Sequence, residues 1–203
     1  LFLSPIFILL VAALIVFISL GIRQSFGLFM RPITMDLGWG REVLSVALAT
    51  QNLIIGIAAP FAGILADRWG APKTIALGGL IFSLGMIMMS QSVAPTAMFA
   101  SAGLLTGVGL GACGLPLILS VIGKIAPAEK RSLWLGIVTA CATGGQLLIV
   151  PFSQNLLTTM DWAIALVALA VMAGLIIPMA YSMSAAVTLD TGRDTEIDTR
   201  EAI

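Results

Sequence analysis

The charged residue best placed for a chemical role is Arg23, because it lies deep inside an apolar segment. An arginine at the centre of a bilayer costs roughly 2.5–3.5 kcal/mol on insertion scales, and less near the ends of a helix. A functional use of the charge would offset that cost. The planar guanidinium group matches a carboxylate through two parallel hydrogen bonds, so Arg23 is a candidate for binding a small organic anion.

Arg23 also has two structural alternatives, which the sequence leaves open. The side chain can extend to the outer headgroups, or it can pair with Asp36 or Glu42. Ser19 and Phe26 share its helical face, which predicts a narrow stripe facing a pore. Depth within the apolar segment does not decide between the substrate role and the structural ones.

Uncharged polar residues inside apolar segments are weaker candidates for substrate contact. Thr139, Thr143 and Gln146 recur at i, i+4 and i+7 and therefore share one helical face. Hydrogen bonding between helices is the commoner use of such groups in membranes. Together with Arg23, the candidate substrate-binding residues are Gln24, Gln51, Asn52, Thr143 and Gln146.

Several kinds of chemistry have no support in the sequence. There is no histidine, and Cys113 and Cys141 lie in apolar stretches without a spacing typical of metal ligands. No Asp or Glu lies clearly inside an apolar segment, so an intramembrane protease or lipid transferase would lack its base, carboxylate pair or metal. We therefore expect no enzyme, catalytic residue, metal or cofactor. The formal net charge of zero gives no indication of a nucleic-acid partner.

The elements that must position these residues are long apolar helices. Of the 203 residues, 59% are hydrophobic and 10% are charged, a composition typical of chains that live in a lipid bilayer. Apolar stretches of about 20 residues can cross the hydrocarbon core as helices. The sequence predicts an all-α membrane protein with a bundle over 1–183, built from helices at 5–29, 43–65, 72–91, 95–123, 131–153 and 162–183. The first segment lacks a basic leader and a small-residue cleavage site, so we expect a membrane helix there and no signal peptide.

Basic residues in the polar connections set the expected orientation. One set of alternate connections, including the tail, holds Arg68, Lys73, Lys124, Lys130, Arg131, Arg193 and Arg200, whereas the other holds only Arg31 and Arg41. The positive-inside rule places the first set, and both ends of the chain, in the cytoplasm. We expect an integral protein of a bacterial cytoplasmic membrane. Residues 184–203 mix Asp, Thr, Arg and Glu without helical periodicity, and we expect them to be disordered and to begin a central cytoplasmic loop.

Small residues recur at the four-residue spacing that lets membrane helices pack closely. Gly103, Gly107 and Gly111 form such a ridge on the fourth predicted helix. The fifth predicted helix has another, formed by Gly136, Ala140 and Gly144. Both ridges are typical of membrane proteins in general.

The connection after the second helix, Gly63–Lys73, reads GILADRWGAPK. It resembles the G-x-x-x-D-R-x-G-x-x-K signature between helices 2 and 3 of the major facilitator superfamily. The loop Gly123–Arg131 looks like the family's short basic loop between helices 4 and 5. The resemblance implies one six-helix half of a major facilitator fold, made of two inverted three-helix repeats. It also implies a conformational latch against the missing C-terminal half, formed by Gly63, Asp67, Arg68, Gly70 and Lys73.

Two further stretches, Gly21–Phe29 and Asp36–Glu42, look like the monocarboxylate and oxalate/formate-type branch of the superfamily. This less specific resemblance implies secondary active transport of a small organic anion, a monocarboxylate or dicarboxylate, by alternating access. A major facilitator transporter for drugs or another solute class is the alternative. The superfamily's drug antiporters tend to carry an arginine on helix 4 where this sequence has Gly103. More remote alternatives are an integral membrane enzyme and a membrane protein that does not transport.

Overall fold

The computed structural model describes residues 5–183 and consists, over that range, of helices joined by short connections. Six helical spans are long and apolar enough to cross a membrane, which confirms the predicted all-α membrane class. The spans are Pro5–Leu37, Arg41–Trp69, Ala71–Ser90, Pro95–Ile125, Ala128–Thr159 and Trp162–Met183. The tail expected to be disordered lies outside the described residues.

Four of the spans correspond to one principal helix each. These are α1 (Pro5–Leu37), α2 (Arg41–Trp69), α3 (Ala71–Ser90) and α8 (Trp162–Gly174) with its continuation to Met183. The fifth span joins a short 3-10 turn, η2 (Ala128–Lys130), to α7 (Arg131–Thr159). The fourth is divided into α4 (Pro95–Met98), a π-helix η1 (Phe99–Leu105), α5 (Thr106–Cys113) and α6 (Leu115–Ile125).

Helix α1 does not end at residue 29, as its polar residues suggested, but continues to Leu37. Ile33 is fully buried, so the apolar face of the helix runs on past Arg31 and Pro32. Asp36 then accepts a hydrogen bond of 2.9 Å from the Trp162 indole, which ties the extension to α8. At about 1.5 Å per residue the helix is about 50 Å long, more than the ~30 Å hydrocarbon core, so it projects beyond the membrane.

The fourth predicted helix, 95–123, is interrupted rather than continuous. Gly114 has an extended backbone (φ −81°, ψ −175°) between α5 and α6. Pro116 has no N–H to offer the Ala112 carbonyl one turn back, and its ring would clash with that carbonyl in a regular helix. Helix α6 therefore begins inside the membrane span Pro95–Ile125.

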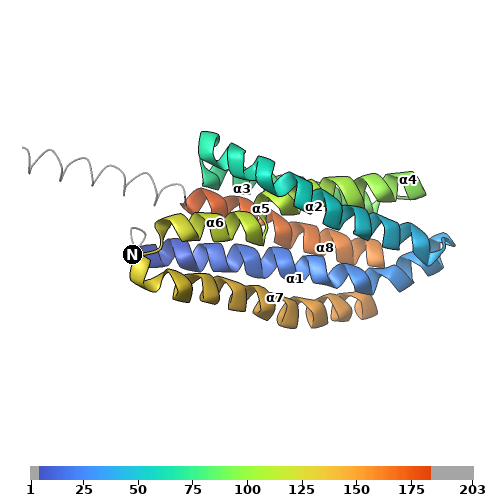
Figure 1. Ribbon diagram of the computed structural model, residues 1–203. Coiled ribbons are helices and arrows are strands. Elements are labelled where there is room, and N and C mark those ends of the chain that lie inside the picture. Colours follow the sequence, from blue (N-terminus) through green and yellow to red (C-terminus); the bar gives the residue numbers. More distant parts are fainter. Residues whose placement is uncertain (1–4, 184–203) are drawn as a thin grey trace, which may run out of the picture.

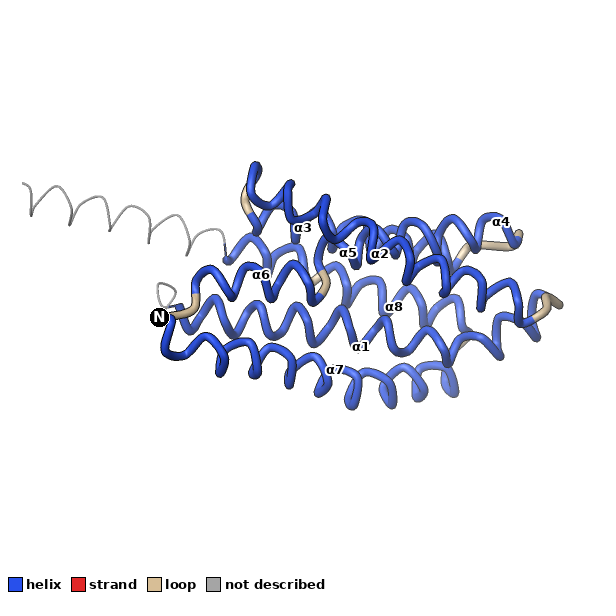
Figure 2. Tube along the Cα trace, in the orientation of Figure 1, coloured by secondary structure: helices blue, strands red, loops and turns tan. Residues whose placement is uncertain are grey.

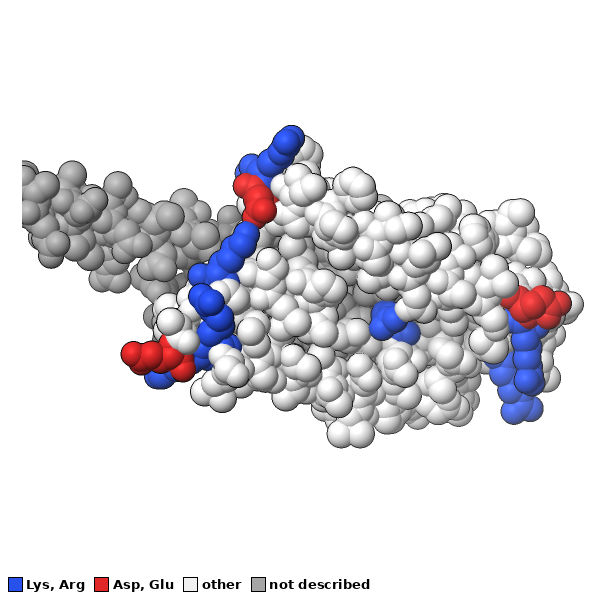
Figure 3. Space-filling model, viewed as in Figure 1, with Lys and Arg blue, Asp and Glu red and all other residues white. Residues whose placement is uncertain are grey.

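The helices form an elongated bundle with α1 between α7 and α6 in the view of Figure 1. The N-terminal end, the α2–α3 turn and the α6–α7 connection lie at one end of the bundle, and the α1–α2 connection lies at the other (Figures 1 and 2). This arrangement matches the alternation of connections from which the orientation was predicted. Charged side chains gather at the two ends, and one basic patch interrupts the uncharged surface between them in this view (Figure 3).

Glycines bring specific helix pairs into close contact. A Cβ at Gly107 or Gly111 would meet Ile54 or Ala58 of α2 within 3 Å, so the ridge predicted on the fourth span packs as expected. The ridge predicted on the fifth span does not form the close helix contact. Gly136 faces open space within the described residues, and the close approach to α1 falls at Gly145, where a Cβ would lie 2.7 Å from the Phe17 carbonyl carbon.

Candidate functional site

Arg23 is held by a neighbouring helix rather than by an acid. Its guanidinium group donates a hydrogen bond to the Oδ1 atom of Asn52 on α2. The Nδ2 atom of Asn52 donates to the Leu48 carbonyl one turn back, at 2.9 Å, which turns the amide oxygen toward Arg23. Neither carboxylate proposed as a partner takes that place, because Asp36 accepts from Trp162 and the only salt bridge within residues 5–183 is elsewhere. No carboxylate within residues 5–183 therefore balances the charge of Arg23.

A hollow of about 210 Å³ lies beside Arg23. Its lining comes from four helical segments, namely Ser19, Leu20 and Arg23 of α1, Ile55 of α2, Leu110 of α5, and Gly114, Leu115 and Pro116 at the helix break. The hollow is large enough for a small organic acid of a few non-hydrogen atoms. Arg23 supplies the only formal charge among its lining residues.

The break at Gly114 places the start of a helix at this hollow. Helix α6 begins at Leu115, and no side chain caps its N-terminus. The first N–H groups of a helix lack intrahelical acceptors and carry a partial positive charge. Arg23 and the α6 N-terminus therefore present two positive groups to one small hollow, an arrangement that favours an anion.

The remaining substrate candidates lie away from this hollow. Gln51 is buried and donates to the Ala102 carbonyl at 3.1 Å and to the Thr106 hydroxyl at 2.7 Å, so it joins α2 to the π-helical region. Thr143 is exposed on α7, and its hydroxyl bonds to the Thr139 carbonyl at 3.3 Å. Gln24 is exposed and Gln146 is half-buried. Of the six candidates, the structure brings together Arg23 and Asn52.

Sequence reasoning missed the segment Gly114–Pro116 as part of the site. The signal that could have found it is a glycine two residues before a proline inside a membrane helix, since the proline removes a backbone donor and the glycine leaves room for the Leu110 carbonyl, which a Cβ would meet. Ser19, which shares the helical face of Arg23 as predicted, also lines the hollow. Its hydroxyl is bonded to the Val16 carbonyl at 3.4 Å.

The loop after α2 forms a second polar centre, at the end of the bundle. Gly70 has φ +93°, a left-handed value that suits glycine, and it ends α2 and begins α3 at once. Asp67 forms an ion pair of 2.6 Å with Lys124 at the end of α6, and both side chains are 65% exposed. Within the described residues Arg68 and Lys73 form no ion pair. A Cβ at Gly63 would meet nothing within 4 Å, so no close helix contact requires this glycine there.

The family model described as Major Facilitator Superfamily matches residues 9–196. Curated relatives include mouse monocarboxylate transporter 11, 28% identical over 159 residues, and human monocarboxylate transporters 7 and 2, 28% identical over 130 residues and 27% over 156. These matches cover 75%, 64% and 72% of this chain, respectively, and 34%, 24% and 31% of the relatives. The chain thus spans about a third or less of the length of these relatives.

Proposed function

Because the chain belongs to the major facilitator superfamily, we propose that it forms one half of a secondary transporter that carries small organic anions. The observation that carries this proposal is the hollow at which Arg23, oriented by Asn52, meets the N-terminus of α6. Within residues 5–183 the cation, which lies in a membrane span, has no carboxylate partner, and a bound carboxylate would supply a balancing negative charge.

The relatives support a carboxylate as the anion, because those named above are monocarboxylate transporters. The hollow accommodates monocarboxylates and small dicarboxylates alike, so we propose the substrate class at the level of short organic acids. In this proposal the substrate carboxylate accepts from the guanidinium group and from the Leu115 and Leu117 N–H groups in the first turn of α6, since Pro116 between them has none.

We further propose that the end of the bundle with the Asp67–Lys124 pair faces the cytoplasm. The basic residues of the α2–α3 and α6–α7 connections lie at this end, as the positive-inside rule requires. An exposed ion pair contributes only about 0–1 kcal/mol, so Asp67 can exchange Lys124 for a partner on the second six-helix half at little cost. Such an exchange would let the loop close and release one side of the cavity during alternating access.

The test is uptake by the full-length protein reconstituted in proteoliposomes, with labelled lactate, pyruvate and oxalate as the panel. We expect at least one of these acids to be transported. Arg23→Ala should lower kcat/KM at least about 30-fold, equivalent to ~2 kcal/mol for a lost hydrogen bond to a charged group. Arg31→Ala is the matched control, since Arg31 lies on the same helix but is exposed near its end.

Two results would contradict the proposal. One is unchanged uptake by Arg23→Ala at equal levels of folded protein, checked by size-exclusion chromatography. The other is an equal loss in Arg31→Ala, which would show that the loss of uptake is not specific to the arginine at the hollow.

A further inference from the structure

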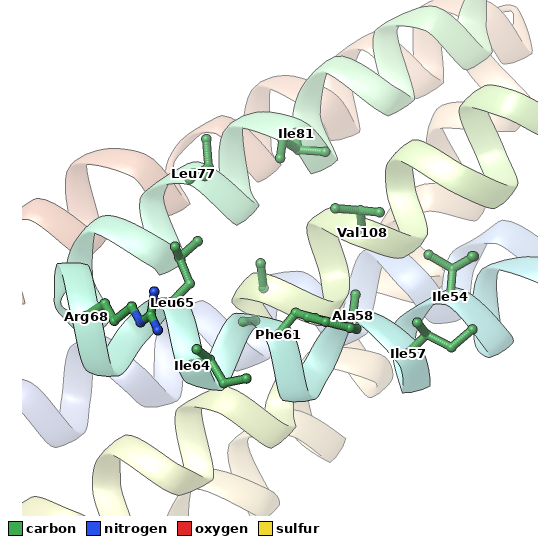
Figure 4. Close-up of a pocket in the computed structure, with 12 residues that line it drawn as sticks. Ile54, Ile57, Ala58, Phe61, Ile64, Leu65, Arg68, Leu77, Ile81 and Val108 are labelled. Carbon is green, nitrogen blue, oxygen red and sulfur yellow. The ribbon is translucent and has the colours of Figure 1, made fainter.

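A second hollow lies on the side of α2 that faces away from Arg23. It has a volume of about 560 Å³ and runs between α2 and α3, with Val108 and Ala112 of α5 as its floor. Except for Arg68, all its lining side chains are apolar, and on α2 they extend from Ile54 to Arg68 (Figure 4). Phe61 is 66% exposed and Ile57 51%, so these described residues leave the groove open along its length.

Helical geometry separates this groove from the transport site. At about 100° per residue, Asn52, Gly63 and Asp67 lie on one face of α2. Ile54, Phe61 and Arg68 lie roughly 160–200° around the helix from Asn52. Since Asn52 faces Arg23, the groove lies on the opposite side of α2, away from the anion hollow.

The neighbours Asp67 and Arg68 illustrate this division. Asp67 turns toward α6 and pairs with Lys124. Arg68 turns toward the groove, and Figure 4 shows its nitrogen atoms lying toward Leu65 at one end of the hollow. Within residues 5–183 Arg68 has no ion pair, so its charge is available to an anion outside the chain.

The dimensions suit one lipid chain beneath one headgroup. From Ile54 to Arg68, α2 rises about 21 Å at ~1.5 Å per residue, compared with ~15 Å for the hydrocarbon depth of a single leaflet. An acyl chain can fill the aliphatic groove while its phosphate reaches the guanidinium group, which binds phosphate through paired hydrogen bonds. Arg68 also lies in the last turn of α2, at the end of the bundle that holds the α2–α3 and α6–α7 connections (Figure 1).

We propose that the groove between α2 and α3 is a binding site for an anionic phospholipid, with its headgroup on Arg68 and one acyl chain along Ile57 and Phe61. This site is separate from the anion hollow, and it does not depend on which solute is transported. The negatively charged lipid is preferred over a zwitterionic one because only the former leaves a net charge for the arginine to neutralise.

The experiment titrates delipidated full-length protein with phosphatidylglycerol or phosphatidylcholine and counts bound lipids by native mass spectrometry. Arg68→Ala should weaken phosphatidylglycerol binding about fivefold, equivalent to ~1 kcal/mol per basic residue near a charged surface, and leave phosphatidylcholine binding unchanged. Arg68→Lys should retain most of the preference, because a lysine still offers a positive charge to phosphate.

Arg131→Ala is the matched control, because Arg131 is an exposed arginine at the same end of the bundle but does not line the groove. Equal lipid binding by wild type and Arg68→Ala, or an equal loss in Arg131→Ala, would overturn the proposal. A photo-crosslinker at position 61 in native membranes should capture lipid. Capture of peptide from the second half or from another copy would show that protein covers the groove, and would also overturn it.

Discussion

The chain holds a cation against α2 at two places, and they differ in what balances the charge. In the membrane span, Arg23 meets the neutral amide of Asn52, so the pair keeps a positive charge beside a hollow. At the end of the bundle, Lys124 meets the carboxylate of Asp67, so the pair is neutral and lies 65% exposed to water. The first arrangement is suited to binding an anion, and the second to a contact that is easily exchanged.

The surroundings of the two pairs explain why their charges have different effects. Coulombic interactions are weak between exposed groups in water and stronger where the dielectric constant is low. An unpaired charge in a span therefore has a large effect on what binds near it, whereas an exposed ion pair adds ~0–1 kcal/mol. Substitutions that shift the helix carrying one partner, or that change the charge of one partner, test this difference between the two pairs.

The largest effect on stability is expected where α1, which carries Arg23, packs on α7. Gly145→Ala places a Cβ 2.7 Å from the Phe17 carbonyl carbon, so the helices must separate. Overpacking of this kind typically costs about 1–3 kcal/mol, and the thermal unfolding temperature of the full-length protein should fall. The shift of α1 should lower uptake as well.

Gly144→Ala is the control for that substitution. A Cβ at Gly144 would be 3.8 Å from the nearest atom of the Phe17 ring, an ordinary contact distance. We expect no loss of stability, because alanine is the better helix former. Equal destabilisation by both variants would show that the loss does not arise from the close approach of Gly145 to the Phe17 backbone.

An intermediate effect is expected from Asn52→Asp, which would turn the Arg23–Asn52 pair into an ion pair like Asp67–Lys124. The new carboxylate would neutralise Arg23 and compete with the substrate for the guanidinium group. The KM for a transported organic acid should rise about tenfold, equivalent to ~1.4 kcal/mol, while thermal stability rises. Uptake kinetics and thermal unfolding measure both. An unchanged KM would mean that substrate does not use the free charge of Arg23.

The smallest effect is expected from Lys124→Ala. Loss of the exposed ion pair should change the free energy of unfolding by less than about 1 kcal/mol. Uptake should change severalfold at most, because Asp67 remains available to its proposed partner on the second half. Asp67→Ala should reduce uptake more than Lys124→Ala does. Equal uptake by the two variants would argue against a latch that operates through the carboxylate.

The six spans and the family could be predicted because each depends on local sequence, and Arg23 stood out as a candidate for the same reason. Apolar runs of sufficient length specify membrane helices, and a lone arginine in such a run needs compensation. The Asp67 loop could also be recognised from a contiguous motif. Gly70 indeed adopts the positive φ that a tight reversal between α2 and α3 requires.

The partners of these residues could not be predicted, because they depend on how distant helices pack. Arg23 and Asn52 are 29 residues apart and meet only because α1 and α2 cross at that level. Gln51, one position earlier, faces the other way and bonds to Thr106. The helix break at Gly114 was missed because a glycine alone is common in closely packed membrane helices, and the signal lay in its spacing to Pro116.

The central claim is that the unpaired charge of Arg23 binds a carboxylate. Its most direct test measures binding of short organic acids and of their uncharged amides to full-length wild type and Arg23→Gln by isothermal titration calorimetry. The account predicts that wild type binds at least one acid more tightly than its amide and that Arg23→Gln loses this preference. If no acid binds better than its amide, or if the preference survives in Arg23→Gln, the account is contradicted.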